Sequence, residues 1–121
     1  GQWFSINLKP IGVGGSYTPC YVNFQRPLSR TRVGFDSDDL CLDFRLNPST
    51  KNWEMKDAAD YQERIGLGMY SIEEQKSVEV ARKYALSLIQ AEEAPFDGSW
   101  SEWQPELDWK DFSFPPKWAK V

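Results

Sequence analysis

Residues 39–46, DLCLDFRL, alternate strictly between apolar and polar side chains, and this period of two predicts a β-strand. The leucines and the phenylalanine would face one way, and Asp39, Cys41, Asp43 and Arg45 the other. Asp is depleted in strands because its short side chain competes for backbone hydrogen bonds and packs poorly. Two Asp residues on one face therefore predict that this face meets either solvent or a ligand.

The N-terminal part of the chain predicts further strands. Residues 3–8 and 19–25 also alternate, and the glycine-rich residues 11–16 between them predict a turn. Residues 53–55 predict a short fourth strand, because the Asn, Pro, Ser and Thr that precede them are typical of turns. The first half of the chain is thus expected to form an antiparallel sheet.

The period changes after these strands and favours helices. A short helix is expected over residues 58–65, where two glycines follow and end it. A longer helix is expected over residues 72–92, because Ser71 and Glu74 form a capping box and apolar residues recur at helical spacing. Strands followed by helices place the chain in the α+β class.

The length of 121 residues predicts one domain, residues 1–121. Within it we expect barrel strands in residues 1–55, helices in residues 56–93 and a Trp-rich tail in residues 94–121. The tail is interpreted as a segment that covers apolar surface of the sheet. The alternative is an aromatic wall against which the base of a ligand stacks.

The overall charge and the residue types narrow the possible functions. The net charge is −4, and the basic residues are spread along the chain, which argues against nucleic-acid binding. The absence of His removes the commonest general base and the commonest ligand of transition metals. The two cysteines lack the spacing of a thiolate site, and no membrane-spanning run or signal peptide is evident, which predicts a cytoplasmic protein without membrane contact.

The polar faces of two predicted strands could meet. Tyr21 and Asn23 would look onto Asp39 and Asp43, and Asp57 could either cap the helix that follows or turn one oxygen to the same place. Carboxylates that converge repel one another unless a proton or a cation lies among them. Oxygen ligands from Asp and Asn suit Mg²⁺ or Mn²⁺. From the pattern alone, a solvated acidic face remains an equal alternative.

Three motifs, CYVNFQRPLSRTRVGFDSDDLCLDF, WEMKD and PFDGSW before a Trp-rich end, resemble the FomD-like family of metal-dependent phosphohydrolases. The resemblance runs from Tyr21 to Trp118 and implies a small antiparallel β-barrel or a strongly curled sheet, followed by a helical segment. Family members have an additional N-terminal portion that builds barrel strands. We therefore expect those strands to be missing from this chain, so that the barrel is open or is completed by self-association, or the chain is inactive.

The resemblance also implies a function and a site. Family members hydrolyse phosphoanhydrides, so a cytidylyl-phosphonate or a nucleoside di- or triphosphate is the expected substrate, and one or two Mg²⁺ or Mn²⁺ ions are the expected cofactor. Tyr21 is the expected proton donor. The metal ligands implied by the motifs are Asn23, Asp39, Asp43 and Asp57.

Two basic residues are candidates to contact the substrate. Lys56 could pair with phosphate oxygens or replace Tyr21 as the acid, and Arg30 is a weaker phosphate-binding candidate. Two functions from other classes stay open. One is a non-catalytic module that binds nucleotides or RNA through its Trp residues, and the other is a protein-interaction domain.

Overall fold

The computed structural model of the chain describes residues 1–10 and 17–103. The predicted turn over residues 11–16 and the end of the Trp-rich tail, residues 104–121, lie outside the described residues. The element order is strands followed by helices, as the sequence predicts. The elements are β1 (Phe4–Pro10), β2 (Tyr17–Gln25), β3 (Ser29–Arg30), β4 (Phe35–Asp36), β5 (Asp39–Leu46), β6 (Trp53–Lys56), α1 (Ala58–Gly66) and α2 (Ile72–Gln90).

The main sheet has four antiparallel strands in the order β1-β2-β5-β6, and β3 pairs with β4 in a small separate hairpin. The antiparallel α+β prediction is therefore confirmed. Within residues 1–10 and 17–103 the sheet stays open at β1 and β6, and no closed barrel forms. The β3–β4 hairpin was not predicted, because two residues per strand are too few to show a period.

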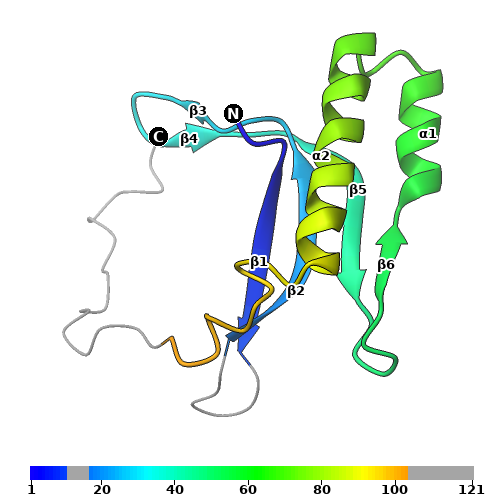
Figure 1. Cartoon of the computed structure of the whole chain (residues 1–121). Coiled ribbons are helices and arrows are strands. Elements are labelled where there is room, and N and C mark those ends of the chain that lie inside the picture. The colour runs from blue at the N-terminus through cyan, green and yellow to red at the C-terminus, as the bar shows by residue number, and fades with distance from the viewer. Residues whose placement is uncertain (11–16, 104–121) are drawn as a thin grey trace, which may run out of the picture.

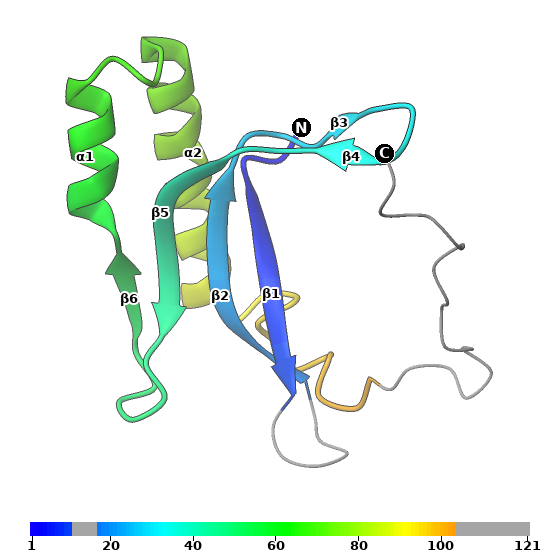
Figure 2. The same ribbon diagram turned by 180° about the vertical axis from the view of Figure 1, so that it is seen from behind.

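The hydrophobic core lies between the sheet and the helices. Helix α2 crosses one face of the sheet, and α1 packs beside β5 (Figure 1). The opposite face of the sheet is turned toward the viewer in Figure 2. The buried core residues from the sheet are Phe4, Val22, Phe24, Leu40, Leu42 and Phe44, and those from the helical part are Tyr61, Tyr70, Val78, Ala81, Ala85 and Leu88.

Helix α2 begins at the predicted capping box. The Ser71 hydroxyl oxygen accepts a hydrogen bond from the Glu74 backbone N–H at 3.2 Å, and the Glu74 carboxylate accepts one from the Ser71 N–H at 2.8 Å. Glu74 also accepts a hydrogen bond from Arg26 Nε at 2.7 Å, which ties the start of α2 to the end of β2. The cap thus fixes the helix and its position on the sheet.

We predict that Ser71→Ala lowers the free energy of unfolding by about 1 kcal/mol, because it leaves the Glu74 N–H without its partner. Ser77→Ala is the matched control, since Ser77 lies in the same helix and its hydroxyl only donates to the Glu73 carbonyl oxygen. Urea unfolding of both variants is the measurement. Equal effects of the two substitutions would contradict a specific role for the cap.

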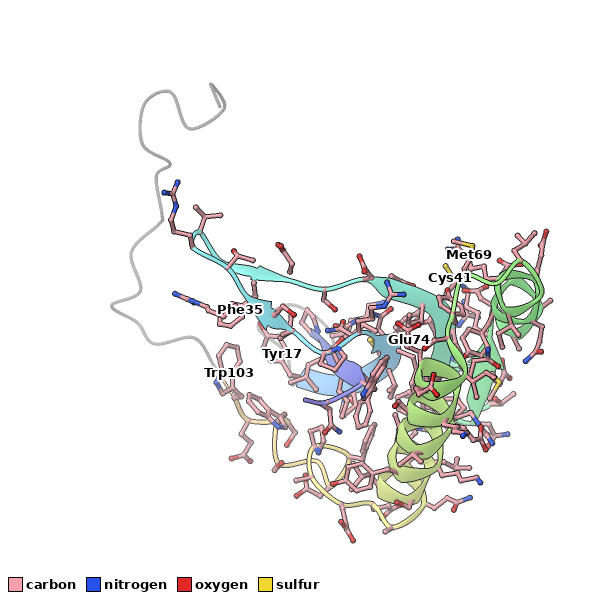
Figure 3. All side chains as sticks on the ribbon, turned by 90° about the horizontal axis from the view of Figure 1, so that it is seen from above. Tyr17, Phe35, Cys41, Met69, Glu74 and Trp103 are labelled. Atoms are coloured by element: carbon pink, nitrogen blue, oxygen red, sulfur yellow. The ribbon has the colours of Figure 1, made fainter. Side chains whose placement is uncertain are left out.

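The described part of the tail contacts the sheet. Phe96 packs against Trp53 with ring centroids 5.4 Å apart, and Trp103 lies edge-on to Tyr17 at 5.0 Å (Figure 3). The covering role expected for the whole segment stays a prediction, because the remainder of the tail lies outside the described residues. In the ranges 1–10 and 17–103, none of the helices has the length and apolar character needed to cross a membrane.

Candidate active site

A row of polar residues crosses the open face of the sheet. Asn23 lies opposite Ser5 on β1 and opposite Asp43 on β5, and Asp43 in turn lies opposite Lys56 on β6. Residues directly opposite each other in antiparallel strands share a face. The row is therefore on the side away from α2, which Figure 2 presents to the viewer.

A bulge in β5 brings the second carboxylate to this row. In a regular strand, Asp39 and Asp43 would be about 13 Å apart. The register between β2 and β5 shifts here, and Cys41 has a left-handed backbone with a φ of 54°. The Cys41 N–H donates to Asp39 Oδ1 at 2.6 Å, so the Asp side chain itself holds the bulge. The strict alternation predicted for this strand is wrong at this point.

Tyr70 supports the bulge from the core side. Its buried hydroxyl donates to the Leu40 carbonyl oxygen at 2.9 Å, and its ring stacks on Tyr61. The contact joins β5 to the segment before α2, which explains why local sequence patterns did not reveal the bulge.

We expect Tyr70→Phe to lower the free energy of unfolding by about 1–3 kcal/mol, because it leaves the buried Leu40 carbonyl oxygen without this hydrogen bond. Tyr61→Phe is the matched control: it removes a hydroxyl from the stacked ring, and among the described residues that hydroxyl has no hydrogen-bond partner. Thermal unfolding of both variants tests this. A loss as large for Tyr61→Phe would mean that removing either hydroxyl from this ring pair is costly, and that the Leu40 hydrogen bond has no specific role.

The Asn23 amide lies between the two carboxylates. One of its terminal atoms is 3.0 Å from Asp43 Oδ1 and 3.1 Å from Asp39 Oδ2. A nitrogen in this position donates a hydrogen bond to both carboxylates, which suits the site without a cation. Rotation of the amide by about 180° would place its carbonyl oxygen there, and three oxygens would then face a common point. Such an arrangement is stable only with a cation among the oxygens.

The Tyr21 hydroxyl completes the site. It donates a short hydrogen bond to Asp43 Oδ2. Burial, this hydrogen bond and the negative charges of Asp43, Asp57 and Asp39 all raise the pKa of Tyr21 above its usual value. The hydroxyl therefore holds its proton at neutral pH and can serve as a proton donor.

Asp43 is the most buried member of the group, with only 4% of its surface exposed. Burial raises the pKa of its carboxyl group, and the nearby charges of Asp39 and Asp57 raise it further, against the lowering effect of the Tyr21 hydrogen bond. A charged carboxylate in this position lowers the stability of the folded protein, so Asp43 is present although its charge destabilises the fold. This pattern is typical of functional sites.

Asp57 and Lys56 form a pair at the edge of the group. Asp57 stands at the N-cap position of α1 with a left-handed φ of 59°, but its side chain makes no capping hydrogen bond. Its Oδ2 accepts instead from Lys56 Nζ at 2.7 Å, and this hydrogen bond raises the pKa of Lys56. The sequence left open whether Asp57 caps α1 with its side chain or turns an oxygen toward the site, and the side-chain cap is absent. To bind a metal, Asp57 would have to release Lys56.

The donor set fits a cation that prefers oxygen ligands. Across residues 1–10 and 17–103, no three His, Cys, Asp or Glu side chains converge closely enough to hold a metal ion. The protein can nevertheless offer the carboxylates of Asp39 and Asp43 and the amide oxygen of Asn23. Mg²⁺ is commonly held by one or two carboxylates together with water and substrate phosphate oxygens. The residues present therefore fit Mg²⁺ or Mn²⁺ in the presence of a phosphate substrate.

Arg30 is not brought to this group. It lies in the β3–β4 hairpin with its guanidinium 4.7 Å from the centre of the Phe35 ring, and this hairpin projects beyond the end of the main sheet (Figure 1). Besides Lys56, a second basic residue adjoins the group: Arg45, opposite Tyr21 on β5. The alternation of residues 39–46 already placed Arg45 on the face of the two Asp residues, but Arg45 was not among the predicted site residues.

The fold and the site together define an antiparallel α+β protein with a carboxylate, amide and tyrosine group on the open face of its sheet. No family model matches the chain. The cytidylyl-2-hydroxypropylphosphonate hydrolases of Streptomyces wedmorensis and Streptomyces fradiae are each 30% identical to it over 95 residues, covering 78% of this chain and 46% of the relative. The chain thus spans about half the length of the curated relatives it matches.

Two solved structures are similar in fold as well. The phosphatase SC4828 with the non-hydrolysable nucleotide GPCP has a TM-score of 0.73 and 29% identity, covering 98% of this chain and 55% of the other. FomD in complex with CDP has a TM-score of 0.70 and 27% identity, covering 93% of this chain and 60% of the other. The chain belongs to the FomD-like family, as its motifs indicate.

Proposed function

We propose that this chain is a hydrolase of nucleotide phosphoanhydrides that depends on Mg²⁺ or Mn²⁺. The observation that carries the proposal is the meeting of two carboxylates, an amide and a tyrosine hydroxyl at one point on the open face of the sheet. The similarity to hydrolases and to a phosphatase, two of them solved with nucleotide ligands, supports the same reaction class. A cytidylyl-phosphonate or a nucleoside di- or triphosphate is the proposed substrate.

Asn23, Asp39 and Asp43 would hold the cation, and Asp57 would join them if it releases Lys56. A bound divalent cation would neutralise phosphate charge and would orient and acidify the attacking water. The bulge at Cys41 holds Asp39 against the Asn23 amide, and the partly exposed sheet face leaves room for the substrate to approach. One or two cations would be compatible with this set of oxygens.

Tyr21 would protonate the leaving oxygen. Its raised pKa keeps the proton in place until the bridging oxygen gains negative charge, and Asp43 fixes the direction of the hydroxyl. A cation or a substrate that reduces the negative charge around the hydroxyl would make it a stronger acid. Lys56, which lies opposite Asp43, would compensate the charge of the phosphate oxygens.

Incubation with a panel of nucleotides tests the proposal. We expect product release with Mg²⁺ or Mn²⁺, none with EDTA, and recovery when the cation is restored. Hydrolysis that persists in EDTA would contradict the metal requirement. Nucleotide binding without hydrolysis under any of these conditions would favour the non-catalytic module instead. The predicted self-association can be followed on the same samples by sedimentation. The cytoplasmic location stays a prediction from the sequence.

A further inference from the structure

A groove of about 650 Å³ lies on the sheet beside the site, next to Tyr21. Its charged lining residues are Lys9 from β1, Arg45 from β5 and Lys51 from the turn before β6, and no acidic side chain of residues 1–10 and 17–103 lines it. The chain as a whole carries a net charge of −4. A groove lined only by positive charge in an acidic protein is therefore a local feature of this surface and is suited to an anion.

Within the part of the chain that the structure describes, the three cations of the groove have no acidic partner that would neutralise them. Among the residues that the structure describes, neither Lys9, Arg45 nor Lys51 forms an ion pair. Glu54 lies opposite Arg45 on β6, but its carboxylate accepts a hydrogen bond from Asn47 Nδ2 at 2.8 Å instead. The three side chains are thus available for an anionic ligand.

The turn that carries Lys51 is well defined by hydrogen bonds. The Lys51 N–H donates to the Asn47 carbonyl oxygen at 2.8 Å, and the Asn47 N–H donates to the Asn52 carbonyl oxygen at the same distance. The Asn47 side chain accepts from the next two backbone N–H groups of the turn at 3.0 and 3.2 Å. The backbone that presents Lys51 to the groove is therefore fixed, although its side chain is exposed.

The carboxylates, the Tyr21 hydroxyl and the basic groove follow one another along the sheet. Asp39 lies opposite Gln25, Asp43 opposite Asn23 and Arg45 opposite Tyr21. Three residues before Tyr21 on β2, Thr18 lies opposite Lys9 on β1. The carboxylates, the tyrosine hydroxyl and the groove therefore form a line, with the hydroxyl in the middle. A phosphorus atom held at the carboxylates with its bridging oxygen at Tyr21 would direct its leaving group into the groove.

We propose that the groove binds the leaving group and selects leaving groups that carry an anion, such as a phosphate, a phosphonate or a nucleoside monophosphate. This inference rests on the proposed function. In the step, the water oxygen forms a bond to phosphorus and the bond from phosphorus to the bridging oxygen breaks. The bridging oxygen keeps the electron pair and takes the Tyr21 proton. The water loses one proton to solvent, and Tyr21 is reprotonated from solvent.

The test compares two substrates that differ in the charge of the leaving group. One is a nucleoside diphosphate, and the other is the p-nitrophenyl ester of the corresponding nucleoside monophosphate, whose leaving group has no phosphate. Arg45→Gln and Lys51→Gln should each lower kcat/KM for the diphosphate at least about tenfold, because each removes a charge-assisted contact, and should change it less than about twofold for the ester. Lys76→Gln on α2 is the matched control, with the same charge change on another element.

The outcomes separate this inference from the proposed function. Equal losses for both substrates, or losses no larger than that of Lys76→Gln, would overturn the assignment of the groove while leaving the hydrolase intact. If the parent protein hydrolyses neither substrate, the proposed function fails, and calorimetry with inorganic pyrophosphate then decides about the groove. Binding that is weakened in Arg45→Gln but not in Lys76→Gln would support an anion site, and unchanged or absent binding would overturn it.

Discussion

Tyr21→Phe is expected to lower kcat at saturating Mn²⁺ by at least about a hundredfold, the range in which general acid catalysis contributes. The substitution keeps the ring and its packing and deletes only the hydroxyl that donates to Asp43. A substrate with a much better leaving group should recover part of the loss, because its departure depends less on protonation. Steady-state kinetics on both substrates is the measurement.

Tyr17→Phe provides the control for this variant. Tyr17 lies on the same strand, and the ring contact with Trp103 is kept in the variant. It should leave kcat unchanged within about twofold, since its hydroxyl has no place in the proposed reaction. If Tyr21→Phe turns over a nucleoside diphosphate at the parent rate, Tyr21 only lines the site. The acid would then have to be Lys56 or a water molecule.

The second large effect is expected for Asp43→Asn. This variant removes the central carboxylate of the site, and we expect Mn²⁺ affinity and hydrolysis to fall by at least about a hundredfold, because even residues that only support metal ligands cost 10- to 100-fold when replaced. Asp36→Asn in β4 is the control, with the same charge change on the separate hairpin. It should behave as the parent protein does.

Asp43→Asn should lower metal affinity and hydrolysis, but it should not lower the free energy of unfolding at neutral pH. The pKa of Asp43 is raised in the folded protein, so its charged form is penalised there relative to the unfolded chain. The contribution of this residue to stability is therefore most favourable at acid pH and is lost as the pH rises from the unfolded pKa through the folded one. Without added cation, the variant should be at least as stable as the parent at neutral pH and should lack this dependence. A clear loss of stability at neutral pH would contradict this account of Asp43.

The fold could be predicted from the sequence wherever local signals determine it. Helix α2 begins at Ser71 because both partners of its cap lie within four residues of each other, and β5 follows from its alternation. The bulge at Cys41 could not be predicted, because one of the hydrogen bonds that support it joins Tyr70 to Leu40, 30 positions apart. A contact between residues so far apart in the sequence produces no periodic pattern of residue types.

The candidate site could be predicted from the sequence only in part. The residues Asn23, Asp39, Asp43 and Tyr21 share a face by alternation, and the structure brings their side chains together. Their mutual distances follow from the pairing of β2 with β5 and from the bulge, neither of which a single strand pattern contains. The basic groove was missed for the same reason, since its cations come from three separate parts of the chain.

The metal site is the central claim, and Mn²⁺ binding followed by electron paramagnetic resonance tests it most directly, because the signal of free Mn²⁺ is lost when the ion is bound. We expect the parent protein to bind Mn²⁺, Asp43→Asn and Asp39→Asn to lose binding, Asp57→Asn to weaken it, and Asp36→Asn to leave it unchanged. Mg²⁺ should compete for the same site. A folded parent protein that leaves all Mn²⁺ free would contradict the account, and so would Asp43→Asn and Asp57→Asn variants that bind Mn²⁺ as strongly as the parent.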